Sequence, residues 1–429
     1  MKEIEYKVSQ EDFRRGRLLE LVKRGESTLE EVTPCLGVCY RQAKRLKASY
    51  LGEGVPGLAH GNRGRAASNR ITEEVREKVL RLSEEKYSKF NDSHFTEKLN
   101  EQEGLKISRE TVRSIRRGAS IKPKRRRRAK RHYKRRERKP CRGIMMQWDG
   151  SPHRWLGDGH RPCCLMAAVD DADKRLLAAR FEPVESSAGY LRLLKQVVET
   201  HGIPTSVYQD GHSCLYRNDE HWSLEEQLVG KQKPTQVGQA LESLGIEPIR
   251  AHSPQAKGRI ERTFQTLQDR FIAEMSLFKF QTLEEANLWL QQEGIQLYND
   301  RFVEAPQKRN NAFREVGRRD LDRDICFRYE AIVGNDNAIR MAGLVIDIPP
   351  GPARKGYAKA KVKALQLLDG SWRIYYKDEL IATHDQTPLR SPIPARTKRK
   401  TKGTQEWNWV YMASAPGDET LASTQASPS

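Results

Sequence analysis

Three carboxylates stand where they could do chemistry together. Asp149 and Asp210 each end an apolar run, and Glu261 stands near the start of a helical pattern. Carboxylate oxygens are hard ligands, and three of them suit Mg²⁺ or Mn²⁺ while leaving coordination positions for water or a phosphate. Taken singly, each has a simpler interpretation as a solvated charge at the end of a strand or the start of a helix, which is the usual place of Asp and Glu.

The elements that must position these carboxylates follow a regular order. Apolar runs predict three strands in an antiparallel meander, then a helix, then a fourth strand. Their ranges are 144–149, 163–169, 176–184, 187–200 and 205–210. Three strands, a helix and a strand are the start of a ribonuclease-H-like fold, so we expect an α/β core over 141–315.

A later helix is predicted to carry Glu261. Its buried stripe has helical spacing and consists of Ile260, Phe264, Leu267 and Phe271. Glu261 lies roughly 80° from the centre of that stripe, at the margin of the core, where it can face a cleft. Asp170, Asp171 and Asp173 are competing acidic residues, but they lie where the hairpin must turn, and Asp favours turns without needing a metal.

The three blocks that hold the carboxylates resemble a known set. WDGSPH (148–153), QDGH (209–212) and SPQAKGRIER (253–262) are similar, in this order, to the catalytic blocks of DDE transposases with an integrase core. The similarity is greatest to the bacterial insertion-sequence group catalogued as not classified, and it covers about 10–390.

The resemblance implies two-metal phosphoryl transfer on DNA. Asp149 would bridge two Mg²⁺ or Mn²⁺ ions, Asp210 would bind one of them and Glu261 the other. The protein would bind the terminal inverted repeats of its own element, cleave there, and join the 3′ ends to target double-stranded DNA. A dimer or higher homo-oligomer is expected, because two ends must be brought together.

Two departures from the family pattern limit the comparison. Between Asp210 and Glu261 lie 50 residues, more than in the retroviral-integrase pattern, and we place the excess in a polar, mobile insertion at 218–234. Many relatives also have Lys or Arg seven residues after the Glu, whereas position 268 is Gln.

Four residues near the triad are candidates for auxiliary roles. His153 and His212 each follow a catalytic Asp and are expected to orient a phosphate or the attacking water, with loop packing as an equal alternative. Lys257 and Arg259 precede Glu261 and are expected to touch the DNA end.

The charge of the chain favours a nucleic-acid partner. The 429 residues have a formal net charge of +20, as expected of a protein that neutralises a polyanion. The chain has neither an apolar run near the ~18 residues of a membrane span nor a signal-peptide core, so a cytoplasmic, nucleoid-associated bacterial protein is expected. Its seven cysteines are interpreted as reduced thiols, and a zinc site at Cys35, Cys39 and His60 lacks a fourth ligand.

Two helical units are predicted before the core. Residues 1–65 show a helix-turn-helix pattern whose second helix bears Arg41, Lys44 and Arg45, and a merely solvated helix is the alternative. Residues 66–120 show a second unit, in which Ser108 is the predicted N-cap of another recognition helix. Its residues available for DNA are Arg109, Thr111, Arg113, Arg116 and Arg117.

Three further segments complete the chain. A basic linker at 121–140 includes 13 Lys or Arg between 122 and 139 and is expected to lie along DNA, although a solvated charge block or an RNA-binding segment has the same composition. Strand patterns at 325–390 suggest a small barrel, SH3-like by the resemblance, and 391–429 is expected to be disordered. The main functional alternative is a catalytically inactive helix-turn-helix regulator derived from a transposase.

Overall fold

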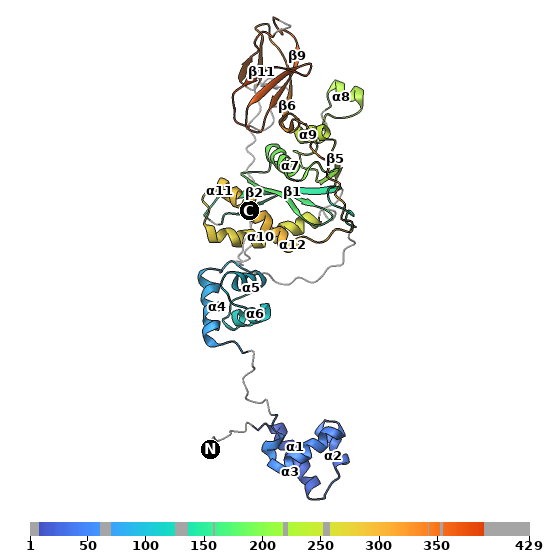
Figure 1. Ribbon diagram of the computed structural model, residues 1–429, viewed down its shortest axis with the longest axis vertical. Coiled ribbons are helices and arrows are strands. Elements are labelled where there is room, and N and C mark those ends of the chain that lie inside the picture. Colours follow the sequence, from blue (N-terminus) through green and yellow to red (C-terminus); the bar gives the residue numbers. More distant parts are fainter. Residues whose placement is uncertain are drawn as a thin grey trace, which may run out of the picture. The chain divides into compact units, whose positions relative to one another are not determined.

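The computed structural model describes residues 8–60, 70–124, 136–157, 159–217, 222–251, 258–341, 343–351 and 355–389. The chain separates into two compact units, Met1–Ser88 with Asp92–Pro123, and Lys89–Asn91 with Lys124–Ser429. The tail 391–429, residues 125–135 of the basic linker, and Lys257 lie outside the described residues. The expected mixture of helical and sheet-containing regions is confirmed (Figure 1).

The first unit begins with three short helices, α1 (Gln10–Lys23), α2 (Leu29–Leu36) and α3 (Tyr40–Glu53), and a 3-10 turn, η1 (Val55–Leu58). Ser9 and Thr28 form capping boxes at the starts of α1 and α2. Gly37 ends α2 with a φ of 66°, which lets the chain turn sharply into α3. The small core includes Leu19, Leu36 and Ala43.

Three more helices follow in the same unit: α4 (Glu73–Glu85), α5 (Asp92–Glu101) and α6 (Arg109–Gly118). They bury Val79, Phe95, Leu99 and Val112. Ser108 caps α6, as the sequence predicts, by accepting a hydrogen bond from the backbone of Thr111.

A five-stranded sheet forms the centre of the second unit. Its strands are β1 (Met145–His153), β2 (Cys163–Asp170), β3 (Leu176–Glu182), β4 (Ser206–Gln209) and β5 (Glu247–Arg250). The order is β3-β2-β1-β4-β5; β1, β2 and β3 form the expected antiparallel meander, and β4 and β5 extend the sheet in parallel. The prediction that the first strand ends at Asp149 was wrong, because pairing with β2 carries β1 on to His153.

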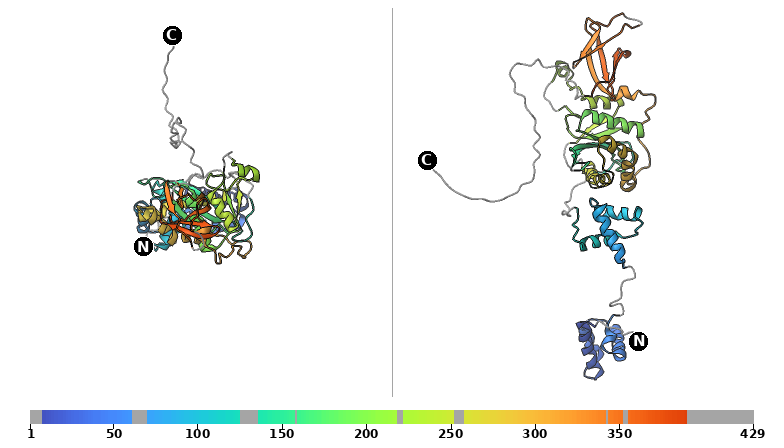
Figure 2. Two further views of the ribbon diagram at one scale, coloured as in Figure 1. Left: turned by 90° about the horizontal axis from the view of Figure 1, so that it is seen from above. Right: turned by 90° about the vertical axis from the view of Figure 1, so that its left-hand side faces the viewer.

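Helices cover both faces of this sheet. On one face, α7 (Ser187–His201) and α9 (Gln236–Leu244) pack on Trp148, Cys164 and Met166. On the other, α10 (Gly258–Phe278), α11 (Leu283–Trp289) and α12 (Ile295–Phe302) pack on Leu165, Ala167 and Val169, with a π-helical turn, η3 (Leu290–Gly294), before α12. Figure 2 shows the green and yellow helices on opposite sides of the sheet. The alternation of side chains along β2 decides which residue enters which core.

The insertion predicted at 218–234 differs from the expected polar segment. Its described part contains α8 (Leu224–Val229), which Ser223 and Glu226 close in a capping box. Leu224, Leu228 and Val229 are each more than 70% exposed, so the helix presents an apolar surface. Residues 218–221 lie outside the described part of the chain.

The C-terminal region contains a short helix, α13 (Leu321–Asp324), and six strands: β6 (Phe327–Ile332), β7 (Ala338–Met341), β8 (Leu344–Asp347), β9 (Lys361–Gln366), β10 (Trp372–Tyr376) and β11 (Glu379–His384). The expected small barrel is not confirmed by the described residues, whose strands do not close into a barrel. The strands form two sheets, β11-β10-β9-β6 and β7-β8, because β7 and β8 hydrogen-bond as strands only with each other.

Candidate active site

Pairing between β1 and β4 brings two of the three predicted carboxylates together. The parallel register pairs Met145 with Ser206 and Gln147 with Tyr208. Two residues further along, the same register places Asp149, on β1, level with Asp210, directly after β4. Both side chains are half-buried. Two aspartates distant in sequence therefore lie side by side at one end of the parallel strand pair.

Nearby backbone groups orient both aspartates. The N–H of Gly150 donates to Oδ1 of Asp149 at 3.1 Å, and the N–H of His212 donates to Oδ1 of Asp210 at 3.0 Å. Burial raises the pKa of Tyr190, and the charges of Glu185, Asp149 and Asp210 raise it further. The charges of all three carboxylates therefore reach the same phenol.

Glu185 is the member of this group that the sequence analysis missed. It lies in the loop between β3 and α7 and accepts a hydrogen bond from the Tyr190 hydroxyl at 2.6 Å. A Cβ added to Gly150 would lie 2.7 Å from the Glu185 carboxyl group, so the glycine gives that carboxylate its space beside Asp149. No local pattern marks Glu185; the sole hint is the glycine directly after Asp149.

The third predicted carboxylate, Glu261, lies in the first turn of α10 and is exposed. The predicted stripe of this helix, from Ile260 to Phe271, is buried against the sheet. Gln268 donates from Nε2 to Oγ of Ser151 at 3.1 Å, so it ties α10 to β1. Among the described residues, no three His, Cys, Asp or Glu side chains lie close enough together to hold a metal ion.

Arg259 is directed toward the protein interior in this structure. Its guanidinium bonds the carboxylate of Asp171 and the carbonyl oxygen of Arg136, and its side chain is 17% exposed. The aspartates at 170, 171 and 173 do lie at the β2–β3 turn, as predicted, but each is only 1% exposed. They are buried and hydrogen-bonded, unlike the usual solvated turn residue.

The two histidines have different surroundings. His153, at the exposed end of β1, makes an edge-on contact with Trp155 at 5.8 Å between ring centroids. His212 lies beside the carboxylate group, with Nδ1 3.8 Å from Oε1 of Glu185, and its Nδ1 also accepts the N–H of Cys214 at 3.3 Å. His212 is therefore the one that faces a catalytic candidate.

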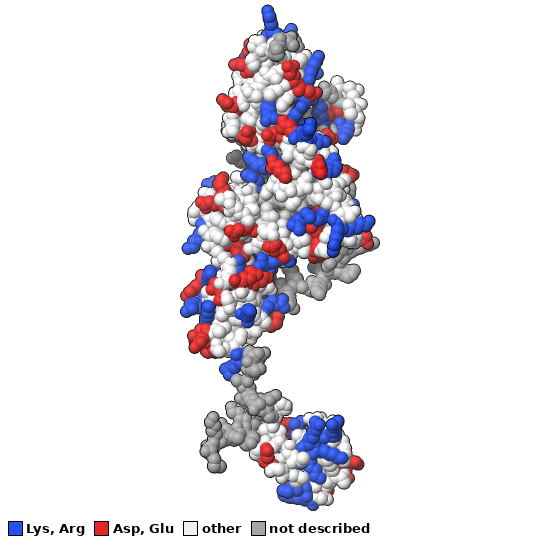
Figure 3. Space-filling model, viewed as in Figure 1, with Lys and Arg blue, Asp and Glu red and all other residues white. Residues whose placement is uncertain are grey.

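The predicted recognition helices both present polar side chains. On α3, Arg41, Lys44 and Arg45 are exposed, and the Lys44 ammonium lies 4.8 Å from the centre of the Tyr40 ring. Figure 3 shows Lys and Arg gathered on one face of this helical group.

On α6, Arg109 and Arg113 are exposed beside Glu110, and Thr111 Oγ1 lies 2.9 Å from Ser108 Oγ. The prediction that Arg116 is available for DNA was wrong, because its side chain is buried, whereas Arg117 is half-buried. Both form ion pairs with Asp92, at 2.9 and 2.5 Å.

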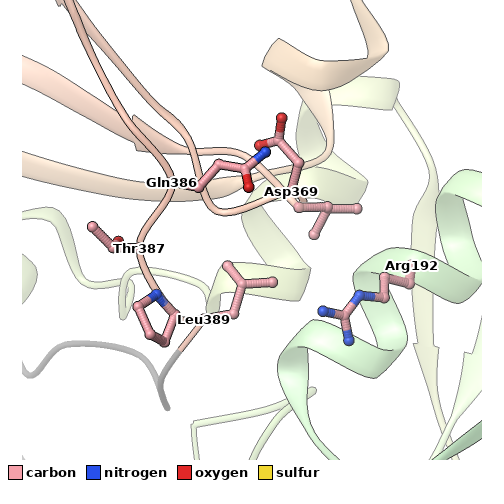
Figure 4. Close-up of a pocket in the computed structure, with 7 residues that line it drawn as sticks. Arg192, Asp369, Gln386, Thr387 and Leu389 are labelled. Atoms are coloured by element: carbon pink, nitrogen blue, oxygen red, sulfur yellow. The ribbon is translucent and has the colours of Figure 1, made fainter.

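Other candidate sites have little to support them. Cys35 and Cys39 are exposed free thiols, and no metal-binding group includes them in the described chain. A pocket of about 400 Å³ lies between α7 and the loops after β9 and β11, lined by Arg192, Asp369 and Gln386 among others (Figure 4). The Arg192 guanidinium bonds Glu182 at 3.1 Å, so it is satisfied within the protein.

No helix in the described part of the chain is both long and apolar enough for a membrane span.

Solved structures resemble this chain only distantly. No family model matches the chain. Among solved structures, the cryo-EM structure of the simian T-cell lymphotropic virus intasome in complex with PP2A regulatory subunit B56 gamma is 13% identical, with a TM-score of 0.28, over 73% of this chain and 99% of that one. The magnesium complex of the HTLV-2 integrase catalytic core domain, in its dimeric form, is 16% identical, with a TM-score of 0.24, over 36% and 88%.

Two curated relatives cover most of the chain. The y4bF protein of Sinorhizobium fredii, which bears a transposase name, is 32% identical over 372 residues, or 86% of this chain and 80% of the relative. The transposase for insertion sequence IS1202 of Streptococcus pneumoniae is 30% identical over 438 residues, or 91% and 92%. With such similarity along nearly its whole length, the chain belongs to the insertion-sequence transposases.

Proposed function

We propose that this protein is a DDE-type transposase that cleaves DNA at the ends of its element and joins the 3′ ends to target DNA. The observation that carries the proposal is the placement of Asp149 and Asp210 at one level of the parallel pair β1 and β4, beside the helix that bears Glu261. The strand order β3-β2-β1-β4-β5, with helices on both faces, supports a ribonuclease-H-like core.

The chemical type of the three proposed ligands suits a hard divalent ion. Three carboxylates offer oxygen ligands suited to Mg²⁺ or Mn²⁺. Two bound ions would activate the attacking hydroxyl group and stabilise the leaving oxygen. Because the described residues contain no group of three already close enough to hold an ion, Asp149 and Asp210 form a half-site. Glu261, exposed in the first turn of α10, would supply the third carboxylate.

Groups of the protein around Asp149 and Asp210 orient the two carboxylates and the His212 ring. The backbone N–H groups of Gly150 and His212 keep one oxygen of each aspartate fixed, which leaves the other oxygen for a ligand. In the neutral His212 ring, acceptance of the Cys214 N–H by Nδ1 places the proton on Nε2, which can donate to a phosphate or to the attacking water. His153 would act at the outer end of β1, and Lys257 would contact the DNA end.

The first unit would supply recognition of the element ends. Its helices α3 and α6 present Arg41, Lys44, Arg45, Arg109, Thr111 and Arg113, and we propose that they enter the major groove as helix-turn-helix recognition helices. The basic linker would add contacts to the phosphate backbone. Two or more copies would bring two ends together on the bacterial nucleoid.

A cleavage and joining assay on labelled terminal-repeat DNA tests the function. Wild-type protein should cut and join with Mg²⁺ or Mn²⁺ and stall with Ca²⁺, whose coordination is looser. Asp149→Asn, Asp210→Asn and Glu261→Gln keep side-chain shape but remove the charge that binds metal, so joining should fall by more than about a hundredfold while end binding survives.

The control for Glu261→Gln is Glu284→Gln, an exposed carboxylate in the first turn of α11, which should join like wild type. A variant of the triad that joins at the wild-type rate would remove that residue from the site. Wild-type protein that binds ends but never cuts them, with any of these metals, would instead be an inactive regulator.

A further inference from the structure

The side chain of Asp171, in the turn between β2 and β3, connects three parts of the second unit. Its Oδ1 accepts a hydrogen bond from Nε2 of Gln147 on β1 at 2.6 Å and from Nη2 of Arg136 at 2.5 Å. Its Oδ2 accepts the backbone N–H of Lys139 at 2.8 Å. Arg259, in the first turn of α10, also bonds Oδ1. One carboxylate thus holds the central strand, the end of the basic linker and the start of α10.

This carboxylate is ionised despite its burial. Its side chain has no exposed surface, and burial alone would raise the pKa of Asp171. The Lys139 N–H and the guanidinium groups of Arg259 and Arg136 outweigh that effect, so the pKa lies below its ordinary value. Charged partners with good geometry are what a buried carboxylate requires, and the loss of its charge would weaken all four bonds together.

A second link joins the same strand and helix beyond the proposed metal ligands. Gln268 on α10 bonds Ser151 on β1 at 3.1 Å. On β1, Gln147 and Ser151 stand two residues before and two residues after Asp149. Side chains alternate along a strand, so these three residues share one face of the sheet.

On α10, the two linking residues lie on either side of Glu261, as Gln147 and Ser151 lie on either side of Asp149 on β1. Arg259 lies two residues before Glu261, and Gln268 lies seven residues after it. With both links made, α10 can neither slide along β1 nor turn about its axis without breaking one of them. We propose that Asp171 is a positioning residue, which sets the place of Glu261 relative to Asp149 by holding Arg259 and Gln147 on one carboxylate.

The test rests on the proposed function and uses the full chain. Asp171→Asn should still bind terminal-repeat DNA, but its joining rate at saturating DNA should fall at least tenfold, and half-maximal joining should need several times more Mg²⁺. A residue that merely stabilises the fold would lower the amount of folded protein without changing the Mg²⁺ dependence.

Asp173→Asn is the matched control. Asp173 lies in the same turn, is also 1% exposed, and has two arginine partners, Arg142 at 3.4 Å and Arg175 at 3.5 Å. Among the described residues, the Asp173 side chain bonds no part of α10, so this variant should be destabilised yet keep the wild-type Mg²⁺ dependence.

Arg259→Gln and the double variant with Asp171→Asn identify the partner. If Arg259 acts through Asp171, the double variant should be no worse than the poorer single variant. If Arg259 acts by touching DNA, the two losses should multiply, and that result would overturn the proposal. A folded Asp171→Asn with wild-type Mg²⁺ dependence would overturn it too. If Asp171→Asn does not fold, an unchanged Mg²⁺ dependence in Arg259→Gln has the same meaning.

Failure of the function itself gives a different result. If wild-type protein cuts nothing with Mg²⁺ or Mn²⁺, the proposed chemistry is wrong and Asp171 has nothing to position. If wild-type protein is active and only the variants behave unexpectedly, the fault lies with the inferred link.

Discussion

The indole N–H of Trp148 donates a hydrogen bond to the side-chain oxygen of Gln209 at 2.9 Å. Each of these residues directly precedes a proposed metal ligand, Asp149 or Asp210. Both side chains are buried, at 0% and 1% exposure, so the bond is shielded from water. It fixes β1 and β4 in register at the level where the two carboxylates must meet.

Loss of this bond should affect catalysis more than an equal loss elsewhere. Trp148→Phe removes the N–H and leaves the Gln209 oxygen short of a partner, at a cost of about 1–3 kcal/mol in unfolding free energy. We expect the joining rate to fall roughly tenfold at temperatures well below the unfolding temperature. A rise of about 1.4 kcal/mol in the activation free energy, caused by misplaced carboxylates, has that effect. The control is Trp155→Phe, which removes a buried bond of 2.8 Å to the Ser151 carbonyl. Equal joining by the two variants, at equal stability, would show that the inter-strand bond has no special role.

Glu185 should contribute negative charge to the metal site. Glu185→Gln removes a charge beside Asp149 and Asp210, so half-maximal joining should require on the order of tenfold more Mg²⁺, the equivalent of about 1.4 kcal/mol. Tyr190→Phe is the companion variant, because it removes the 2.6 Å hydrogen bond to Glu185 without altering the charge. A Mg²⁺ titration of joining for both variants decides the point. If Tyr190→Phe shifts the titration as much as Glu185→Gln does, the hydrogen bond matters and the charge does not.

Recognition of the element ends should depend on α3. The triple change Arg41→Ala, Lys44→Ala and Arg45→Ala should reduce the preference for terminal repeats over random DNA by roughly a hundredfold, because contacts to base edges are worth about 1–3 kcal/mol each. The measurement is competitive binding at fixed salt.

The matched control removes three positive charges from α1, at Arg14, Arg17 and Lys23, which are also exposed. This change should weaken binding to both DNAs alike and lower the salt dependence. Deletion of 1–118 should abolish the preference altogether. Selection of terminal repeats by the isolated segment 140–390 would contradict the assignment.

Asp170 should make the second unit less stable as pH rises from about 4 to about 6. Burial raises the pKa of Asp170 from 3.8 to about 6, although the N–H groups of Gly143 and Ala172 oppose that shift. The folded state therefore keeps a proton that the unfolded state has already lost, and stability falls across this window by up to about 3 kcal/mol and levels off above it.

Urea unfolding at a series of pH values checks this expectation. All seven tryptophans follow residue 147, so their fluorescence reports the second unit and not the first. Asp170→Asn has no proton to lose, and the difference between wild type and variant should change between pH 4 and pH 6. A constant difference would show that Asp170 titrates normally.

Local pattern predicted the elements that carry the triad. The strand and helix runs around Asp149 and Asp210 and the buried stripe of α10 follow from apolar periodicity, which the strand alternation and the helical turn impose. The last strand, β11, has a weaker local signal, because its hairpin turns at Lys377 and Asp378, with φ of 46° and 69°, without the usual glycine.

Contacts between segments that are distant in the sequence could not be predicted from local sequence patterns. Glu185 reaches the half-site from a loop, and Asp171 looked like an ordinary turn residue. The partners that reveal their roles, Tyr190 and Arg259, become neighbours only when the sheet and its helices are assembled. The same holds for Arg116, whose burial on Asp92 cannot be read from its basic neighbours.

The strand order also has a consequence for the protein during its own synthesis. On the ribosome β1 emerges before its parallel partner β4, and the carboxylates cannot come together until the intervening helix α7 has crossed the sheet and α10 has followed. The helices up to Pro123 pack within their own unit and can fold first. On the proposed function, the DNA-recognition unit of a nascent chain would therefore fold before its catalytic carboxylates come together.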